Sequence, residues 1–351
     1  MERYIALDVH AESTTCAVVS STGKRLKQVV VETSGSALIS FLSAMPGRKH
    51  LVLEEGTQSA WLHEILSRQV DELVVAIPAK TAGNKNDSED AWRLAEQLRT
   101  GTLLKKVFKS PELASLRAAV RAYRLLTIDV VRIKNRLKAI FRARGVSLSS
   151  EAYDSESRSA CLAALPQPSR YQAAMLGQQL DATLPVLEEA EAHLRAEAQK
   201  VPSVARVATV PGFGLIRAAT LVAATITPAR FRTTRQFWSY AGLAIVTRSS
   251  SDWIQSKSGW VRGNVNQTRG LNRNRHPWLK DVLKGAALNV TTVMKDHPLR
   301  SDYERMLQSG TKPTLARLTI ARRLAAAALA CWRKQEEYDP SKHKSHIVAV
   351  P

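Results

Sequence analysis

The sequence predicts an α/β domain at the N-terminus, a long coiled-coil-like helical region after it, and an all-α domain at the C-terminus. Short apolar runs alternate with helical patterns through about the first hundred residues. Helical periodicity then covers residues 112–144 and 170–200, and further helical patterns follow. With 351 residues, 44% of them hydrophobic, the chain is long enough for two or three domains. We expect domains at 1–105, 106–200 and 201–338, and a flexible tail at 339–351.

The N-terminal domain is expected to open with three strands. Tyr4–Val9 (YIALDV) has the apolar character of a buried strand, and TTCAVVS, the turn STGK and RLKQVVVET predict a hairpin behind it. Three strands followed by alternating helices and strands is an order that resembles the ribonuclease-H-like fold of the RuvC resolvases. The later elements are expected at Ser34–Met45 (helix), His50–Leu53 (strand), Trp61–Arg68 (helix) and Leu73–Ile77 (strand).

The helix expected over residues 112–144 has basic side chains spaced four residues apart. Residues at that spacing share one face of a helix, so they would form a cationic ridge able to contact phosphates. The nucleic-acid-binding residues expected here are Lys134, Lys138 and Arg142 on one face, together with Arg136.

The second long helix, over residues 170–200, is expected to lie antiparallel to the first. Pro185 falls inside it and predicts a kink or a break, because proline removes a backbone donor. The C-terminal domain is expected to contain helices at Leu215–Ala224, Arg235–Ala241, Leu279–Lys295 and Leu315–Lys334.

The charge of the chain points to a polyanionic partner. There are 51 Lys and Arg against 31 Asp and Glu, a net charge of +20. Residues 101–150 contain 12 basic and 2 acidic side chains, and residues 201–300 contain 15 and 3. Two localised cationic blocks favour nucleic-acid binding over a generally solvated basic surface, which is the alternative interpretation.

The cysteines and the N-terminus indicate an intracellular protein. Cys16, Cys161 and Cys331 are far apart and form no C-x-x-C pair, so neither a disulfide framework nor a thiolate zinc site is indicated. MERYIALDVH has no long apolar segment behind a basic start, and LAAAALACW is too short to span a bilayer. We therefore expect a cytoplasmic, nucleoid-associated protein with no membrane partner.

Four carboxylates are candidates for a metal site. Asp8 lies within the apolar strand IALDVH, where an isolated charge would be costly without a cation or strong donors. Glu54 ends the strand LVLE and would emerge beside Asp8 if the two strands were adjacent. Asp87 and Asp90 lie one helical turn apart at a helix start and share a face. Such a cluster of hard oxygen ligands would select Mg²⁺ or Mn²⁺, as in phosphodiester chemistry.

Each of these carboxylates also has a plainer explanation. Asp, Asn and Ser at a helix start commonly cap its unpaired N–H groups, so Asn86, Asp87 and Ser88 are each candidate N-caps. Local hydrogen bonds could account for Asp8 and Glu54. Glu55 competes with Glu54, because strand phase does not choose between them.

Asp8 in the first strand, Glu54 ending LVLE, and KNDSEDA with Asp87 and Asp90 resemble the D-E-D-D tetrad of the insertion-sequence transposases of family one hundred and ten. The resemblance covers nearly the whole chain. It implies that the tetrad is catalytic and binds Mg²⁺ in a RuvC-like domain, that DNA at the element ends and target is the substrate, and that a bridge RNA encoded by the element guides the reaction.

The C-terminal region contains two motifs that bear on this resemblance. VATVPGFGLIRAATLVA places Gly212 and Gly214 between helical patterns, as in a helix-hairpin-helix whose backbone N–H groups face a phosphate. A plain inter-helix turn explains the same glycines equally well. ARFRTTRQFWSYAGLAIVTRSSSDW then matches, in order, the family's R-F step, its A-G-L segment and a serine.

A serine triplet next to Arg248 is by itself typical of a polar loop. The resemblance places the family's nucleophilic serine on Ser250, which implies a covalent phosphoserine intermediate, although Ser249 and Ser251 stay as alternatives. It also implies that the tetrad and the serine come from different protomers of a homo-oligomer, a dimer or a tetramer.

Cations alternate with tryptophans in the stretch after the serines. Cations can contact phosphates while indoles stack on bases, although buried tryptophans and solvated arginines would show the same composition. The nucleic-acid-binding residues expected in and beside this stretch are Arg248, Lys257, Arg262, Arg269, Arg273 and Arg275.

Three functions are therefore compared. The leading one is a bridge-RNA-guided DNA recombinase that excises and inserts its own element. A metal-only junction-resolving nuclease would not need the serine, and a non-catalytic nucleic-acid-binding scaffold would use its carboxylates only structurally.

Overall fold

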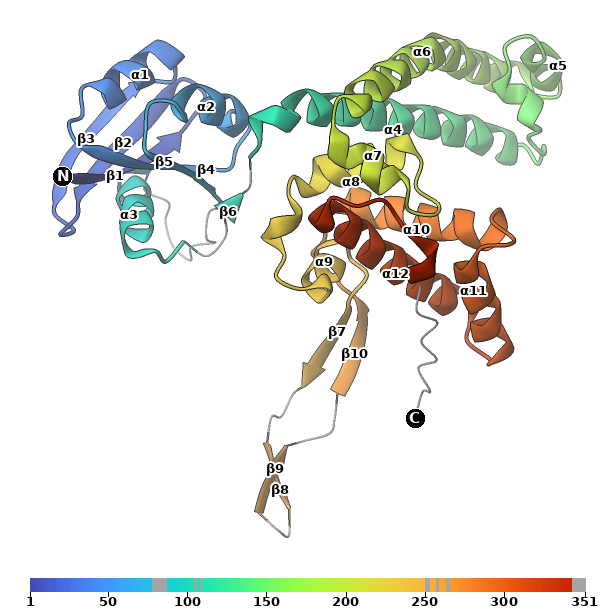
Figure 1. Cartoon of the computed structure of the whole chain (residues 1–351). Helices are drawn as coiled ribbons and strands as arrows, with labels where there is room; N and C mark the ends of the chain where they lie inside the picture. The colour runs from blue at the N-terminus through green and yellow to red at the C-terminus, as the bar shows by residue number, and fades with distance from the viewer. Residues whose placement is uncertain are drawn as a thin grey trace. The chain divides into compact units, whose positions relative to one another are not determined.

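A computed structural model describes residues 1–77, 87–103, 106–107, 109–249, 253–256, 259–262 and 266–342. For residues 87–88, 247–249, 253–254, 262 and 266–269 only the backbone is described. The chain divides into two compact units, Met1–Glu112 and Leu113–Pro351 (Figure 1). The finer division at residues 105 and 200 stays a prediction.

The N-terminal unit is built on a six-stranded sheet with the strand order β3-β2-β1-β4-β5-β6. The first three strands form an antiparallel meander, and β4 and β5 run parallel to β1. The predicted mixed α/β domain is confirmed, and the short edge strand β6 was not predicted. The strands are β1 (Glu2–Val9), β2 (Ser13–Ser20), β3 (Arg25–Glu32), β4 (Arg48–Glu54), β5 (Glu72–Ala76) and β6 (Lys106–Val107).

Three helices cover the two faces of this sheet, and strand alternation decides which side chains meet which helix. Ile5 and Leu7 of β1 pack against α1 and α2, whereas Ala6 between them packs against α3. Both faces of the central strands are therefore buried, which is why β1 and β4 have nearly continuous apolar sequences. The helices are α1 (Gly35–Ser43), α2 (Ser59–Leu66) and α3 (Asp87–Thr100).

Two long helices open the second unit, α4 (Ala114–Arg142) and α6 (Gln167–Gln199). Phe141 packs with Ala173 at one end of the pair, whereas Leu116 and Leu194 share a core at the other, so the helices run antiparallel. Pro185 lies inside α6 without ending it. A short 3-10 helix (Pro111–Leu113) precedes α4, and another (Ser150–Tyr153) and α5 (Arg158–Ala163) connect the pair.

The C-terminal region is helical, as predicted, and its core joins the ends of α4 and α6 to the later helices. Leu221 of α8, Leu283 of α10 and Leu324 of α12 are fully buried in that core. No helix in the described ranges is both long and apolar enough to cross a bilayer. The helices are α7 (Pro202–Ala208), α8 (Leu215–Thr225), α9 (Thr234–Tyr240), α10 (Pro277–Thr292), α11 (Pro298–Gln308) and α12 (Pro313–Lys334), with 3-10 turns at Pro228–Arg230 and Pro340–Lys342.

The expectation of an all-α C-terminal domain is wrong between α9 and α10, where the chain forms strands. β7 pairs antiparallel with β10, and β8 pairs antiparallel with β9. β-branched residues in IVTRS and WVR suit extended backbone, but the polar residues around them hid the strand alternation. The four strands are β7 (Ile245–Ser249), β8 (Trp253–Ser256), β9 (Gly259–Arg262) and β10 (Asn266–Leu271).

Candidate functional site

Asp8 and Glu54 lie side by side at the ends of two neighbouring parallel strands. Leu7 of β1 is paired with Leu53 of β4, so the next residue on each strand is one of the two acids. Both line a cavity of about 220 Å³ together with the β1–β2 turn and the loop before α2. Asp8 is only 8% exposed, and a carboxylate so buried requires compensating positive charge or donors.

The alternation of side chains along β1 and β4 indicates which face of the sheet Asp8 and Glu54 occupy. Asp8 follows Ala6 by two residues and Glu54 follows Val52 by two, and both of those apolar side chains pack against α3. Successive side chains on a strand point to opposite faces. The two acids are thus expected on the side of the sheet where α3 lies.

The other two acids of the tetrad are in the first turn of α3. Asp87 is its first residue, and the side chain of Asp87 is outside what the structure describes. The carboxylate of Asp90 accepts a hydrogen bond from Arg93 at 2.6 Å, and its side chain is 17% exposed. Among the described residues there is no group of three or more acidic, histidine or cysteine side chains placed to hold a metal. The structure therefore brings Asp8 and Glu54 together and packs α3 on their sheet, whereas the placement of the Asp87 side chain lies outside what it describes.

Glu55, the alternative to Glu54, forms an ion pair and a hydrogen bond with neighbouring side chains. The Nζ atom of Lys109 is 2.8 Å from a Glu55 carboxylate oxygen, and the hydroxyl of Ser59 donates to Glu55 at 3.0 Å. Lys109 is a buried cation whose side chain is only 5% exposed. Burial, together with the charge of Lys109, also lowers the pKa of His63. The charge of Glu55 is thus balanced within the protein.

Two residues near the acids were missed by sequence reasoning. His10 has its Nε2 atom 3.4 Å from the Asp8 carboxylate, and its position two residues after Asp8 on the same strand end was the available signal. Lys109 has no comparable signal, because it is distant in sequence from Glu55 and only the sheet brings them together.

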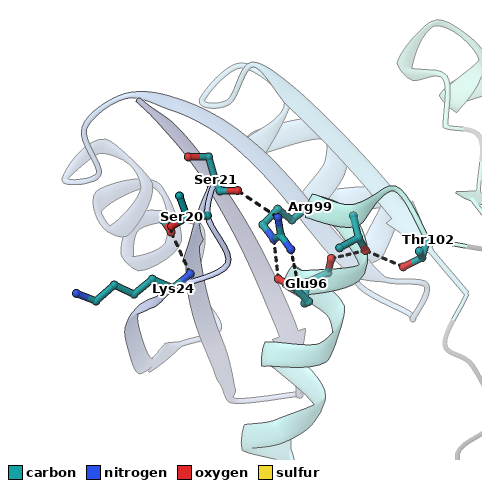
Figure 2. A network of polar contacts seen from close by, with 8 residues as sticks. Ser20, Ser21, Lys24, Glu96, Arg99 and Thr102 are labelled. Atoms are coloured by element: carbon teal, nitrogen blue, oxygen red, sulfur yellow. Dashed lines mark hydrogen bonds and ion pairs between the residues drawn. The ribbon is translucent and has the colours of Figure 1, made fainter.

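Contacts at the far end of α3 hold this helix on the sheet. Arg99 donates to the backbone carbonyl of Ser21 at 3.1 Å and is held in place by Glu96 of the same helix, as Figure 2 shows. Further along α3, the indole of Trp92 donates to Gln28 at 3.0 Å. These contacts tie α3 to the hairpin of β2 and β3 and thereby position its first turn.

The cationic ridge of α4 is exposed where it was predicted. Ile133 and Leu137 are buried in the seam with the neighbouring helices, so the basic positions between them face outward. Lys134 is half-buried, with its Nζ 5.1 Å from the centre of the Tyr153 ring. Three further basic residues of this helix, Arg136, Lys138 and Arg142, are exposed.

Gly212 and Gly214 occupy the turn between α7 and α8, and they differ in what surrounds them. Gly212 has a φ of +76°, and a Cβ added there would overlap the backbone carbonyl of Ala286 in α10. Gly214 is the N-cap of α8, with φ of −102°, and nothing lies within 4 Å of an added Cβ. The first glycine is thus required by packing, whereas the second borders open space.

The serines follow β7. Ser249 is the last residue of that strand, and Ser250 and Ser251 lie outside the described residues. The same is true of Lys257, while three other predicted nucleic-acid contacts are described by their backbone alone: Arg248 on β7, Arg262 on β9 and Arg269 on β10.

The two remaining arginines lie beyond β10. Arg273 is exposed, and Arg275 is half-buried. Arg275 lies directly over Gly242 of the A-G-L segment, whose φ of +71° and missing side chain make room for it. Trp260 on β9 is 67% exposed, whereas Trp278 is partly buried and stacks with Arg124, whose guanidinium lies 5.3 Å from the ring centre.

Family comparisons agree with this arrangement. A sequence model of the IS110-type DEDD transposases matches residues 5–143, which include the sheet with Asp8 and Glu54 and the helix α3. A second model, described as the transposase IS116/IS110/IS902 family, matches residues 204–304, which include the glycine turn, the A-G-L segment and the serines. No individual curated protein matches the chain. The two matches in this order show that the chain belongs to the IS110 family of DEDD transposases, enzymes that cleave and recombine DNA.

Proposed function

We propose that this transposase moves its own insertion sequence by Mg²⁺-dependent DNA strand cleavage and exchange through a covalent phosphoserine, guided by a bridge RNA. The observation that supports the proposal most directly is the pair Asp8 and Glu54 at adjacent strand ends around one cavity. The strand order of the sheet supports a ribonuclease-H-like, RuvC-type domain.

The donor atoms of the proposed site suit a hard divalent cation. Asp8, Glu54, Asp87 and Asp90 offer only carboxylate oxygens, which Mg²⁺ and Mn²⁺ prefer over softer ligands. Glu54 is favoured over Glu55, because the pairing of Leu53 with Leu7 places Glu54 beside Asp8. When bound, the ion would supply positive charge to the phosphate that is attacked. Asp90, whose side chain is 17% exposed, would exchange its contact with Arg93 for the ion.

The serine would hold the cleaved strand. Its Oγ forms a bond to the DNA phosphorus as one P–O bond of the DNA backbone breaks. A general base of the protein accepts the hydroxyl proton, and the departing strand end takes up a proton and leaves as a hydroxyl. The phosphodiester between serine and DNA replaces the phosphodiester of the cleaved DNA backbone, so rejoining of the strand needs no ATP. We assign this role to Ser250, with Ser249 and Ser251 as alternatives. The A-G-L segment and the strand β7 directly precede these serines in the chain.

The basic surfaces would bind the nucleic acids. The exposed ridge of α4, on the pair of helices that we interpret as a coiled-coil-like linker, and the arginines of β7 to β10 suit phosphate contacts. The turn at Gly212 and Gly214 would act as a helix-hairpin-helix, with the N-terminus of α8 toward a phosphate. Base pairing with the bridge RNA would choose the target. A dimer or tetramer would bring the serine of one protomer to the tetrad of another.

The test of the chemistry is to trap the covalent intermediate. Wild-type protein incubated with a nicked target duplex, bridge RNA and Mg²⁺ should form a denaturant-resistant protein–DNA adduct. Ser250→Ala should abolish the adduct, while Ser249→Ala and Ser251→Ala should retain it. An adduct that Ser250→Ala retains but Ser249→Ala or Ser251→Ala loses would move the nucleophile to that serine. Cleavage at the wild-type rate by a variant with all three serines replaced by alanine would contradict the phosphoserine and indicate a metal-only nuclease.

Metal binding can be measured independently of DNA cleavage. Mn²⁺ titrated into the protein and followed by electron paramagnetic resonance should bind the wild type, and Asp8→Asn should lose at least one site. The matched control is Glu64→Gln, an exposed acid on α2 away from the cavity, which should bind as the wild type does. Equal Mn²⁺ binding by all three proteins would contradict the assigned ligands.

A further inference from the structure

One cavity in the described part of the C-terminal unit is not explained by the tetrad, the serines or the ridge. It measures about 680 Å³ and lies where the base of the β7/β10 ladder meets α10 and α12, which pack together (Figure 1). Pockets of this size commonly hold small organic groups. We call it the α10–α12 pocket, and the side chains used below are Ile245, Leu288 and Leu315, which are apolar, and Lys280, Lys284 and Arg317, which are basic.

The floor of the α10–α12 pocket is apolar and open to solvent. Ile245 is 52% exposed, Leu288 48% and Leu315 54%, although each is a large hydrophobic residue. These side chains come from β7, α10 and α12, so one patch is assembled from three elements. An exposed apolar patch of this kind is typical of a surface that binds a partner or a ligand.

The rim of the same pocket is cationic. Lys280 and Lys284 lie one turn apart on α10, and Arg317 of α12 lines the same pocket while its guanidinium lies 5.8 Å from the ring centre of Tyr303. None of the three forms an ion pair with a described residue, and no described acid lines the pocket. The Nε atom of Arg317 is buried, with no hydrogen-bond partner among the described residues.

Lys280 and Lys284 repel each other, and the nearby charge of Asp281 only partly offsets this repulsion. Burial, together with the charges of Arg275 and Lys284, lowers the pKa of Lys280. A bound anion would offset this repulsion. The pocket therefore fits a ligand that joins a flat, weakly polar body to a strong anion.

We propose that the α10–α12 pocket binds an unpaired nucleotide of a nucleic-acid strand, with the base on the aliphatic floor and the backbone phosphates at Lys280, Lys284 and Arg317. Ile245 begins β7 and Ser249 ends it, which at strand spacing is roughly 13 Å. That span suits a strand that passes from the pocket toward the serines. The proposal rests on the proposed function, since it assumes that this region handles nucleic acid.

The direct test is photocrosslinking of the full chain. Single strands containing 4-thiothymidine or 4-thiouridine should crosslink to peptides of α10 or α12, and the DNA and RNA arms identify which strand the pocket takes. Crosslinks confined to other peptides would overturn the proposal. Benzoylphenylalanine placed at Leu315 should likewise capture the oligonucleotide, and capture of a second copy of the chain instead would assign the pocket to a protein segment.

Affinity of two pocket variants gives the quantitative test. Lys284→Ala should weaken oligonucleotide binding and reduce the slope of log K against log salt by about 0.7, the loss of one phosphate contact on a single strand. Leu315→Asp should weaken binding by introducing a charge into the floor. The matched controls are Lys295→Ala and Val293→Asp, exposed positions near the end of α10 that do not line the pocket.

The outcomes separate this inference from the proposed function. If the pocket variants bind like their controls while wild-type protein forms the phosphoserine adduct, only the pocket assignment fails. If the variants lose affinity while wild-type protein forms no adduct, only the proposed chemistry fails. Circular dichroism melts matching the wild type establish that each variant is folded.

Discussion

Replacing Gly212 by alanine should destabilise the C-terminal unit through two separate effects. The backbone at Gly212 has a φ of +76°, a conformation that costs an L-residue about 1–2 kcal/mol. The added Cβ would also overlap the carbonyl oxygen of Ala286 and lie 3.0 Å from its carbon, and forced overpacking of this kind costs about 1–3 kcal/mol. Because the obstacle is helix backbone, it does not move aside as a side chain would. The expected loss is therefore about 2–5 kcal/mol.

The assay is thermal and urea unfolding of the full chain, followed by circular dichroism at a helical wavelength. For a unit of this size each kcal/mol lowers the unfolding temperature by roughly 2–4 °C, so Gly212→Ala should lower it by at least about 4 °C. Gly214→Ala is the control, because its φ of −102° suits alanine and nothing lies within 4 Å. The reasoning is refuted if the two variants unfold within about 0.5 kcal/mol of each other.

Two further predictions concern ionic contacts. Burial lowers the pKa of His50, but hydrogen bonds to Glu72 and Glu2 outweigh it and leave that pKa raised. The stability from these bonds should be complete below about pH 6.5 and lost as pH rises through the raised value, so the difference in urea midpoint between wild type and His50→Gln should shrink with rising pH. Arg158→Met should cost about 3 kcal/mol in thermal unfolding, because its side chain is 7% exposed and it forms a bidentate pair with Asp181.

Each of these predictions has a control residue of the same amino-acid type. Burial and the charge of Lys109 lower the pKa of His63, so the contribution of that residue should have the opposite sign. The effect of His63→Gln should grow as pH rises through the lowered pKa and level off above about pH 6.5. Arg132→Ala removes an ion pair on α4 whose arginine is 65% exposed, and it should change the free energy of unfolding by less than about 0.5 kcal/mol. A pH-independent His50 effect, or equal losses for Arg158 and Arg132, would contradict the ionic assignments.

Much of the N-terminal architecture was determined by the sequence alone. The apolar run around Asp8 and the run ending at Glu54 specify two buried strands, because only a sheet covered on both faces needs such continuous hydrophobicity. The polar residues before Ala91 specify the start of α3. The periodicity of residues 112–144 likewise predicts α4 and its outward ridge, since helical spacing separates its buried and exposed faces.

Other features were decided only by tertiary structure, because they depend on partners far away in the chain. Lys109 balances Glu55, and Arg99 fastens α3 to the turn at Ser21, through contacts between distant segments. The need for glycine at position 212 comes from the backbone of α10, and the α10–α12 pocket exists only because a strand and two helices meet there. The sequence of a helix or strand determines which of its faces is buried and which is exposed. The residues that contact each face are determined only by the packing of the whole chain.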